Sequence, residues 1–186
     1  MNKKMKVVSI TLIIIFFIVG FCYLFKKVNK GVPKEYECEG YVQGETVVLD
    51  DFKVTALGIK KSVIDDEFNP GMKRYLYSLE LNIKNISSED KDITDFYGGC
   101  TILNENKLFR ENAPMELRGM YKGETTERPS IKSQEEKDII LTYNSPNDYT
   151  EDTINFYLSK KLYENEVRAK FDKEIMYDKY IEVKID

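Results

Sequence analysis

Histidine and tryptophan are both absent from this sequence of 186 residues. Without histidine, the chain cannot form a Ser-His-Asp or Cys-His catalytic arrangement, and it lacks a common ligand of zinc. Without tryptophan, a small domain offers a poor platform for the two carboxylates of a glycoside hydrolase, which must face each other across a sugar. We therefore expect no catalytic residue, no cofactor and no metal site, and a protein that is not an enzyme.

Negative charge is missing from the start of the chain and dominates the rest. Residues 1–30 contain six lysines and no acidic residue. Because the whole chain has 28 basic and 32 acidic residues, residues 31–186 hold 22 basic against 32 acidic ones, a net charge of −10. Phosphates favour basic surfaces, so this acidity argues against a nucleic-acid partner.

Residues 7–25 (VVSITLIIIFFIVGFCYLF) carry no charged side chain, and lysines flank them on both sides. The length is close to what a helix needs to cross the hydrocarbon core of a bilayer. No small-residue cleavage site follows the apolar run, which argues against a cleaved signal peptide. We expect a transmembrane signal-anchor at residues 7–25, in contact with membrane lipid, after a short cytoplasmic tail at residues 1–6.

The sequence leaves two properties of this anchor undecided, namely lipidation and orientation. Cys22 could carry a lipid, as in bacterial lipoproteins, although Phe21 is not the small residue that normally precedes such a cysteine. Lysines on both sides of the run leave the orientation undecided by the positive-inside rule. We expect a single-pass protein of the cell membrane with its C-terminal domain outside the cytoplasm, because the character of that domain matches an extracytoplasmic one.

The polar remainder divides into a linker and a strand-rich region. Residues 26–44 have neither helical nor strand periodicity and contain three glycines and a proline, which predicts a stalk. From residue 45 onward, alternation of apolar and polar residues predicts strands, most clearly at residues 75–83. Residues 162–173 fit neither pattern. The other expected strands are 46–49, 52–59, 98–103, 107–110, 137–143, 154–158 and 180–185.

About seven or eight strands with turns between them predict an all-β sandwich over residues 45–186. Three segments also match a known pattern: residues 44–62 open with GETVVLDDFKV, residues 75–93 contain a long strand ending in KNIS, and residues 131–148 lead into a proline-containing loop. Together they resemble the telokin-like, immunoglobulin-fold domain of unknown function found on surface lipoproteins and membrane-anchored proteins of Gram-positive bacteria. The resemblance implies an immunoglobulin-like antiparallel β-sandwich, an extracellular location and a binding role. It brings no catalytic residue, and residues 160–186 extend beyond it.

Cys38 and Cys100 lie outside the apolar run and could form a disulfide in an oxidising compartment. Such a bridge would close a loop of about 60 residues and stabilise the fold by about 2–4 kcal/mol. Two unpaired thiols are the alternative.

Tyrosine is abundant, with 13 residues, and exposed tyrosines are favoured at protein and glycan interfaces. Alternation places most of Tyr75, Tyr77, Tyr143 and Tyr157 inward. The tyrosines that fall in or near loops and the C-terminal segment are Tyr121, Tyr149, Tyr163, Tyr177 and Tyr180. We expect a non-catalytic, membrane-anchored extracytoplasmic binding module whose partner is a protein or a cell-envelope component. The alternative is a structural or accessory subunit of a membrane or cell-envelope complex, which assembles through the transmembrane helix although that helix has no G-x-x-x-G motif.

Overall fold

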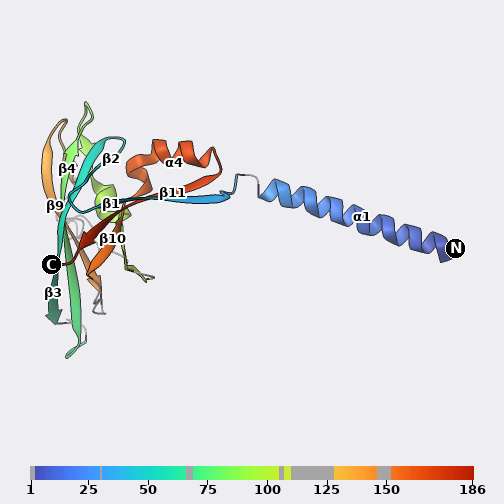
Figure 1. The fold of residues 1–186 in the computed structure, drawn as a ribbon, viewed down its shortest axis with the longest axis horizontal. Coiled ribbons are helices and arrows are strands. Elements are labelled where there is room, and N and C mark those ends of the chain that lie inside the picture. The colour runs from blue at the N-terminus through green and yellow to red at the C-terminus, as the bar shows by residue number, and fades with distance from the viewer. Residues whose placement is uncertain (1–2, 30, 66–68, 105–106, 110–127, 146–151) are drawn as a thin grey trace.

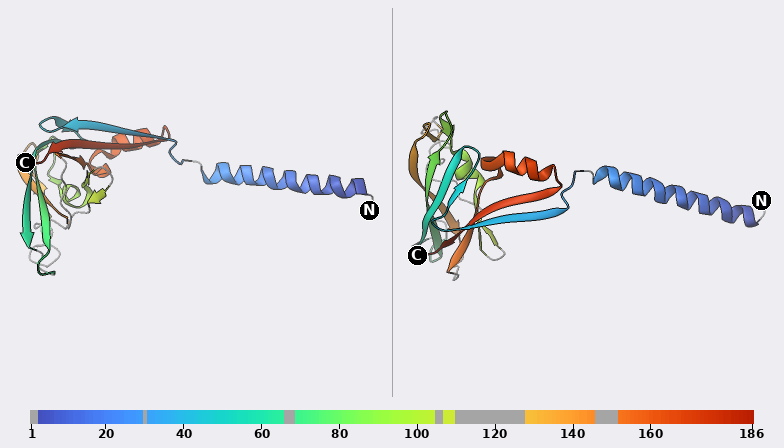
Figure 2. Two further views of the ribbon diagram at one scale, coloured as in Figure 1. Left: turned by 60° about the horizontal axis from the view of Figure 1, so that its bottom comes forward. Right: turned by 45° about the horizontal axis from the view of Figure 1, so that its top comes forward.

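The computed structural model describes residues 3–29, 31–65, 69–104, 107–109, 128–145 and 152–186. One long helix, α1 (Lys3–Val28), extends away from a body that consists mostly of β-sheet (Figure 1). The two further views in Figure 2 show the same separation between α1 and the body.

The body is sandwich-like, with two main sheets. The strands of the five-stranded sheet are, in spatial order, β1 (Glu35–Val42), β11 (Ile175–Lys184), β10 (Thr153–Tyr157), β6 (Thr101–Asn104) and β7 (Lys107–Phe109). The strands of the four-stranded sheet are β2 (Thr46–Val48), β3 (Phe52–Asp65), β4 (Lys73–Asn85) and β9 (Glu136–Ser145). A short ladder joins β5 (Lys91–Asp92) to β8 (Ser130–Ile131). The β1–β11 ladder is parallel, and the other ladders between these strands are antiparallel.

Alternation of side chains explains why the four-stranded sheet forms and where its core lies. In β4, Tyr77, Leu79, Leu81 and Ile83 are buried, while the residues between them are partly exposed. Their neighbours in β9 repeat this pattern, since Ile139, Leu141 and Tyr143 are buried and are paired with β4. These apolar faces form the core together with β3, β10 and β11. The strands predicted at residues 75–83 and 137–143 are confirmed.

Asn85 fastens the end of β4 to the loop before β9. Its side chain is completely buried, and Nδ2 donates hydrogen bonds to the carbonyl oxygens of Glu89 at 2.8 Å and of Ile131 and Lys132 at 3.1 Å each. Its Oδ1 accepts hydrogen bonds from the backbone N–H and hydroxyl of Ser87 at 2.9 and 2.8 Å. A buried amide must be hydrogen-bonded, and here five bonds satisfy it. The KNIS sequence is therefore a structural turn.

In the described part of the chain, three short helices interrupt the expected all-β pattern: α2 (Thr94–Gly99), the 3-10 helix η1 (Lys160–Tyr163) and α4 (Glu164–Phe171). The strand predicted at residues 98–103 starts later, at Thr101, because Gly98 and Gly99 belong to α2. Residues 162–173, which fit neither periodicity, become η1, α4 and the turn that follows. None of the residues of α4 is fully buried, which is why a helical pattern is hard to see in the sequence.

The strand β1 lies inside the segment expected to be a stalk, residues 26–44. It pairs with β11 over eight residues, from Glu35 opposite Ile175 to Val42 opposite Glu182. Only Glu37 and Tyr41 are partly covered in this strand, so its side chains show no clear alternation. Main-chain pairing with β11, rather than a buried apolar face, makes residues 35–42 a strand.

The described side chains of α1 do not belong to the core. The large apolar ones between residues 12 and 28 are 50% to 76% exposed. Among the residues covered by the structure, no helix qualifies as a candidate membrane span.

Candidate functional site

The strand β11 carries two different clusters on its two faces. Tyr177 and Lys179 are buried on the inner face, and Asp178 and Tyr180 lie on the outer face. Because β11 sits between β1 and β10, each face of the strand has neighbours on both sides. Figure 1 shows α4 above β11, and from Tyr177 to Lys184 buried residues alternate with more exposed ones along the strand.

The inner cluster is centred on a buried cation. The side chain of Lys179 is 5% exposed, and its Nζ lies 2.7 Å from Glu166 Oε2 and 3.6 Å from Glu39 Oε2. Three tyrosine rings surround the same nitrogen, with centroids at 6.0 Å for Tyr41, 5.7 Å for Tyr163 and 5.9 Å for Tyr177. A cation near several aromatic faces is held by their quadrupoles. We call these residues the Lys179 network: Glu39, Tyr41, Tyr163, Glu166, Tyr177 and Lys179.

The network ties α4 and η1 to the sheet. Tyr163, at the end of η1, accepts a hydrogen bond on Oη from the backbone N–H of Lys179 at 3.1 Å. Its ring packs edge-to-face on Tyr177 at 6.1 Å, and Tyr177 donates a hydrogen bond to Glu39 on β1. Lys170 of α4 forms an ion pair with Glu37 and lies 5.0 Å from the centroid of the Tyr177 ring. Charges and rings thus hold a helix that buries none of its residues completely.

The surroundings fix the charge states of this network. Burial alone lowers the pKa of Lys179, but the hydrogen bond and charge of Glu166, with Tyr41 and Glu39, outweigh it and raise this pKa above its usual value. The hydrogen bond from Tyr177 lowers the pKa of Glu39, although burial opposes the shift. Burial and the hydrogen bond to Glu39 raise the pKa of Tyr177. The raised pKa of Lys179 favours its charged form, which suits the ion pairs that hold this network together.

The outer cluster lies on the other face of the five-stranded sheet, where Tyr36 and Cys38 are exposed and the remaining members are partly exposed. Tyr157 on β10 and Tyr180 on β11 are cross-strand neighbours, with ring centroids 5.5 Å apart and planes inclined by 28°. The ring of Tyr180 extends over Gly40 on β1, where a Cβ atom would lie 2.5 Å from the Tyr180 hydroxyl oxygen. Because Gly40 has no side chain, this ring can lie across the neighbouring strand. We call the outer cluster the tyrosine face: Tyr36, Cys38, Tyr157, Asp178 and Tyr180.

Polar groups complete the tyrosine face. In addition to burial, the side chain of Cys38 helps to raise the pKa values of Tyr36 and Tyr157, and it lies beside Asp178 in the β1–β11 ladder. Asp178 also forms an ion pair with Lys160 at 3.0 Å. Burial raises the pKa values of Tyr36 and Tyr157, so their hydroxyls are neutral donors near neutral pH. The arrangement offers aromatic surface and hydroxyl groups on one side of the sheet.

The two cysteines expected to pair are unbonded in the structure. Cys38 is exposed on the tyrosine face, whereas Cys100 is buried and accepts a hydrogen bond on Sγ from the backbone N–H of Ser159 at 3.3 Å. Cys100 directly precedes β6, and β11 and β10 lie between β6 and β1. Three strand spacings amount to about 14 Å. A disulfide requires Cα atoms closer than about 7 Å, so this strand order keeps the two thiols apart.

The structure redistributes the tyrosines that the sequence singled out. Tyr77 and Tyr143 are buried as expected, and Tyr75 is partly buried. Tyr163 and Tyr177, expected near loops, are buried in the Lys179 network. Tyr157, expected inward, belongs to the tyrosine face with Tyr180. Two further tyrosines lie outside the described residues: Tyr121 and Tyr149.

No protein-family model matches the sequence, and no curated protein is significantly similar to it. Among solved structures, the chain is similar to an uncharacterized β-sandwich protein from Clostridium difficile, with a TM-score of 0.45 and 11% identity over 81% of this chain and 97% of that one. It is similar to the yjhA protein of Bacillus subtilis, with a TM-score of 0.45 and 16% identity over 78% of this chain and 99% of that one. For ycdA, a predicted lipoprotein of Bacillus subtilis, the TM-score is 0.43 and the identity 8%, over 62% of this chain but only 33% of that protein. Likeness at this level carries no information about a ligand.

Proposed function

We propose that the chain is a non-catalytic, membrane-anchored extracytoplasmic binding module and that the tyrosine face is its recognition surface. The observation that carries the proposal is the arrangement of Tyr36, Tyr157 and Tyr180 on one face of three adjacent strands, where Tyr36 is exposed and the other two are partly exposed. Tyrosine gives a large contact area and a hydroxyl group at a low cost in side-chain entropy. The stacking of Tyr180 beside Tyr157 and above Gly40 orders two of these rings before any partner arrives.

The chemistry of the face favours a protein or cell-envelope partner. Aromatic rings and hydroxyls suit both peptide and sugar groups, and a single carboxylate, Asp178, is already neutralised by Lys160. Residues 31–186 carry a net charge of −10, so anionic polymers are repelled from the domain as a whole. A neutral or basic partner is expected.

The membrane anchor is the second part of the proposal. Residues 7–25 carry no charge, and they lie within α1, a helix of 26 residues. At 1.5 Å per residue such a helix is about 39 Å long, enough for a bilayer core of about 30 Å. Its large apolar side chains are at least half exposed, and transfer of such surface out of water is favourable. The orientation proposed places the sheet domain outside the cytoplasm.

The finer family assignment belongs to the same proposal. Two stacked, mainly antiparallel sheets are consistent with an immunoglobulin-like sandwich. The KNIS sequence supports the telokin-like resemblance, because its residue Asn85 joins the end of β4 to the loop before β9 through side-chain hydrogen bonds. The helices η1 and α4 would then be additions near the C-terminus of that fold.

Photocrosslinking in intact cells tests the binding role without altering a tyrosine. A benzophenone amino acid replaces Val42, which is 54% exposed on the outer side of β1 next to the tyrosine face. The matched control replaces Ile140, which is 59% exposed on the four-stranded sheet. We expect a discrete adduct from position 42 and none from position 140. Equal adducts, or none at position 42, would contradict the proposal.

The alternative, a structural or accessory subunit that assembles through α1, is favoured by one observation. The apolar side chains of α1 are exposed along residues 12–28, so the helix has surface for a membrane partner as well as for lipid. Exchange of residues 7–25 for an unrelated transmembrane helix separates the two functions. If the adduct at position 42 survives the exchange, the domain carries the activity, and if it is lost, the helix does.

A further inference from the structure

We infer that the end of the sheet domain nearest α1 rests on the anionic lipid surface of the membrane. This inference depends on the proposed function, because it requires α1 to lie in the bilayer. The surface concerned is called the membrane-facing end and consists of Val32, Lys34, Phe171, Lys173 and Met176.

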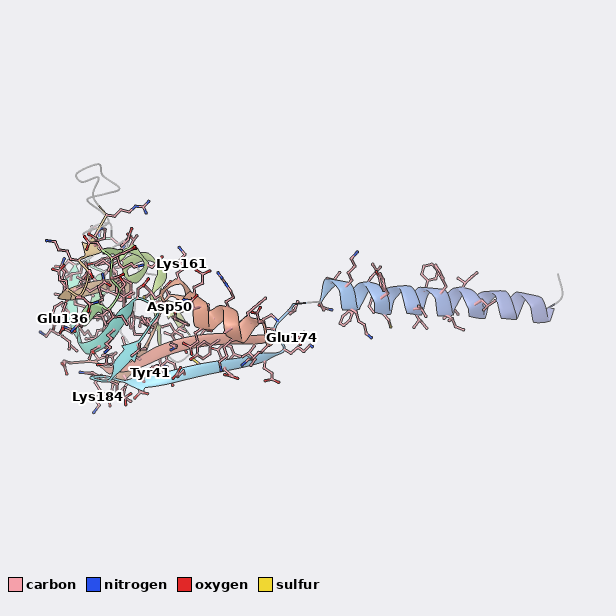
Figure 3. All side chains as sticks on the ribbon, turned by 90° about the horizontal axis from the view of Figure 1, so that it is seen from above. Tyr41, Asp50, Glu136, Lys161, Glu174 and Lys184 are labelled. Atoms are coloured by element: carbon pink, nitrogen blue, oxygen red, sulfur yellow. The ribbon has the colours of Figure 1, made fainter. Side chains whose placement is uncertain are left out.

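The chain itself keeps this end close to α1. The backbone N–H groups of Lys34 and Glu35 donate hydrogen bonds to the carbonyl oxygen of Glu174 at 2.7 and 3.3 Å, and the side chain of Lys34 forms an ion pair with that of Glu174. The start of β1 and the turn between α4 and β11 are therefore one unit. Figure 3 shows Glu174 at the end of the body that faces α1.

Only a short link separates this unit from the helix. Residues 29–33 join Val28 of α1 to Lys34, and even a fully extended link of this length spans at most about 20 Å. The link is shorter than that, because the N–H of Val32 donates to the carbonyl oxygen of Asn29 at 3.2 Å and Gly31 has a φ of +83°. With α1 in the bilayer, the membrane-facing end lies near the lipid head groups.

The side chains at this end suit a membrane interface. Val32, Phe171 and Met176 are each about half exposed, at 50%, 49% and 46%. Apolar and aromatic side chains beside lysines are typical of protein surfaces that insert into the head-group region. Three apolar residues therefore point into solvent at the place where a lipid surface would cover them.

Basic charge is concentrated where α1 meets the domain, in Lys26, Lys27 and Lys30, because residues 31–36 and 171–176 alone hold two lysines and three acidic residues. Residues 26–36 and 171–176 together contain five lysines and three acidic residues, a net charge of +2, whereas residues 31–186 carry −10. One of the three acids, Glu174, is already paired with Lys34. Basic residues next to a membrane-spanning segment are attracted to anionic lipids. An anionic lipid surface would thus be attracted to the lysines that lie beside this end of the domain.

The tip of the β3–β4 hairpin provides an internal comparison. It also exposes large apolar side chains, namely Val63, Ile64 and Met72. In Figure 1 this hairpin projects away from α1. The two ends therefore share apolar exposure, and they differ in their distance from the helix.

The experiment compares two methionine positions in the full chain. Cys22 and Cys38 are replaced by serine, and a bimane label is attached to Met176→Cys or to Met72→Cys, which are 46% and 61% exposed in the unaltered chain. The chain is reconstituted in vesicles of phosphatidylcholine and phosphatidylglycerol that contain a nitroxide-labelled head group. We expect at least about twofold stronger quenching at position 176 than at position 72, and a smaller ratio when phosphatidylglycerol is omitted.

The outcomes separate this contact from the anchor. Equal quenching at the two positions, in a chain that stays with the vesicles through an alkaline wash, overturns the contact and leaves the anchor in place. A chain that the alkaline wash removes overturns the anchor and, with it, the contact. Stronger quenching at position 72 than at position 176 also overturns the contact, because the hairpin tip would then be the part that meets lipid.

Discussion

The two faces of β11 use the same kinds of residue in opposite ways. On the inner face, Tyr177 and Lys179 are buried beneath α4 and are bound to Glu39 and Glu166. On the outer face, one position further along, Tyr180 is partly exposed and stacks beside Tyr157. The difference arises because α4, among the described helices, packs over the inner side of the strand only. Alternate residues of a strand point to opposite faces of the sheet, so a tyrosine on this strand is either part of the buried network or on the face that is available for binding.

The sharpest test of this comparison uses the thiols. Cys38 lies on the open face, and Cys100 is buried beside Ser159. In a Cys22→Ser chain in detergent, we expect Cys100 to react with a thiol reagent at least about 100-fold more slowly than Cys38, because reaction at a buried site requires local opening. Stopped-flow disulfide exchange followed by mass spectrometry measures both rates. A chain in which neither thiol reacts until a reductant is added contains the disulfide that the strand order disfavours.

A large effect on stability is expected from Lys179→Met. The substitution removes the charge at the centre of the inner network and leaves Glu39 and Glu166 without their cation. Because both carboxylates keep access to water, we expect a loss of about 2 kcal/mol, less than for a fully buried pair. Urea unfolding followed by the near-ultraviolet signal of tyrosine measures the change.

The matched control is Lys73→Met on the β3–β4 hairpin. Lys73 pairs with Asp65 at 2.6 Å, but both side chains are exposed. Exposed pairs of this kind contribute less than about 1 kcal/mol. Equal losses in the two variants would show that the inner network is no more important than an ordinary surface pair.

Acid should weaken the inner network through Glu39. Its pKa is lowered in the folded chain by the hydrogen bond from Tyr177, so it stabilises the fold at pH values above the ordinary glutamate pKa of 4.5. That contribution is lost as the pH falls through the lower pKa of the folded state. We expect Glu39→Gln to be less stable at neutral pH and to lose less further stability in acid than the unaltered chain. Urea midpoints measured across the acid range for both chains test the slope.

The smallest stability effect is expected at Gly40. An alanine there places a Cβ atom 2.5 Å from the hydroxyl of Tyr180, which must move, but a side chain can rotate away at little cost. We expect Gly40→Ala to change stability by less than about 1 kcal/mol while altering the tyrosine circular dichroism and the crosslink from position 42. In the control variant Gly98→Ala, the added Cβ meets nothing within 4 Å. This variant should change neither the stability, nor the tyrosine circular dichroism, nor the crosslink from position 42. Unchanged binding in Gly40→Ala would remove Tyr180 from the recognition surface.

The sheet that faces the core was largely predictable, because alternation records burial directly in β4 and β9. The strand β11 was expected to start only at residue 180, yet it begins at Ile175. Its inner positions read Tyr177, Lys179, Ile181 and Val183, and a lysine in that series breaks the apolar alternation. A buried lysine is tolerated there only because Glu166 and Glu39, from distant parts of the chain, neutralise it.

The sites were less predictable than the fold. The tyrosines were recognised as interesting, but periodicity could not show which of them α4 would cover. The strand β1 escaped prediction because it forms through main-chain bonds to residues about 140 positions away rather than through an apolar face. The same missing information, the spatial order of β1, β11, β10 and β6, made the pairing of Cys38 with Cys100 look reasonable in the sequence.

The parallel ladder between β1 and β11 has a mechanical consequence. β1 starts on the side of α1, and β11 leads to the C-terminus on the opposite side of the body (Figure 1). Tension between α1 and a load at that far side would pull the two strands in opposite directions along their length. Eight residue pairs, with evenly spaced hydrogen bonds, would then be loaded in shear together rather than opened one after another. The ion pair between Lys34 and Glu174 crosses the ladder at the end that would feel the pull first.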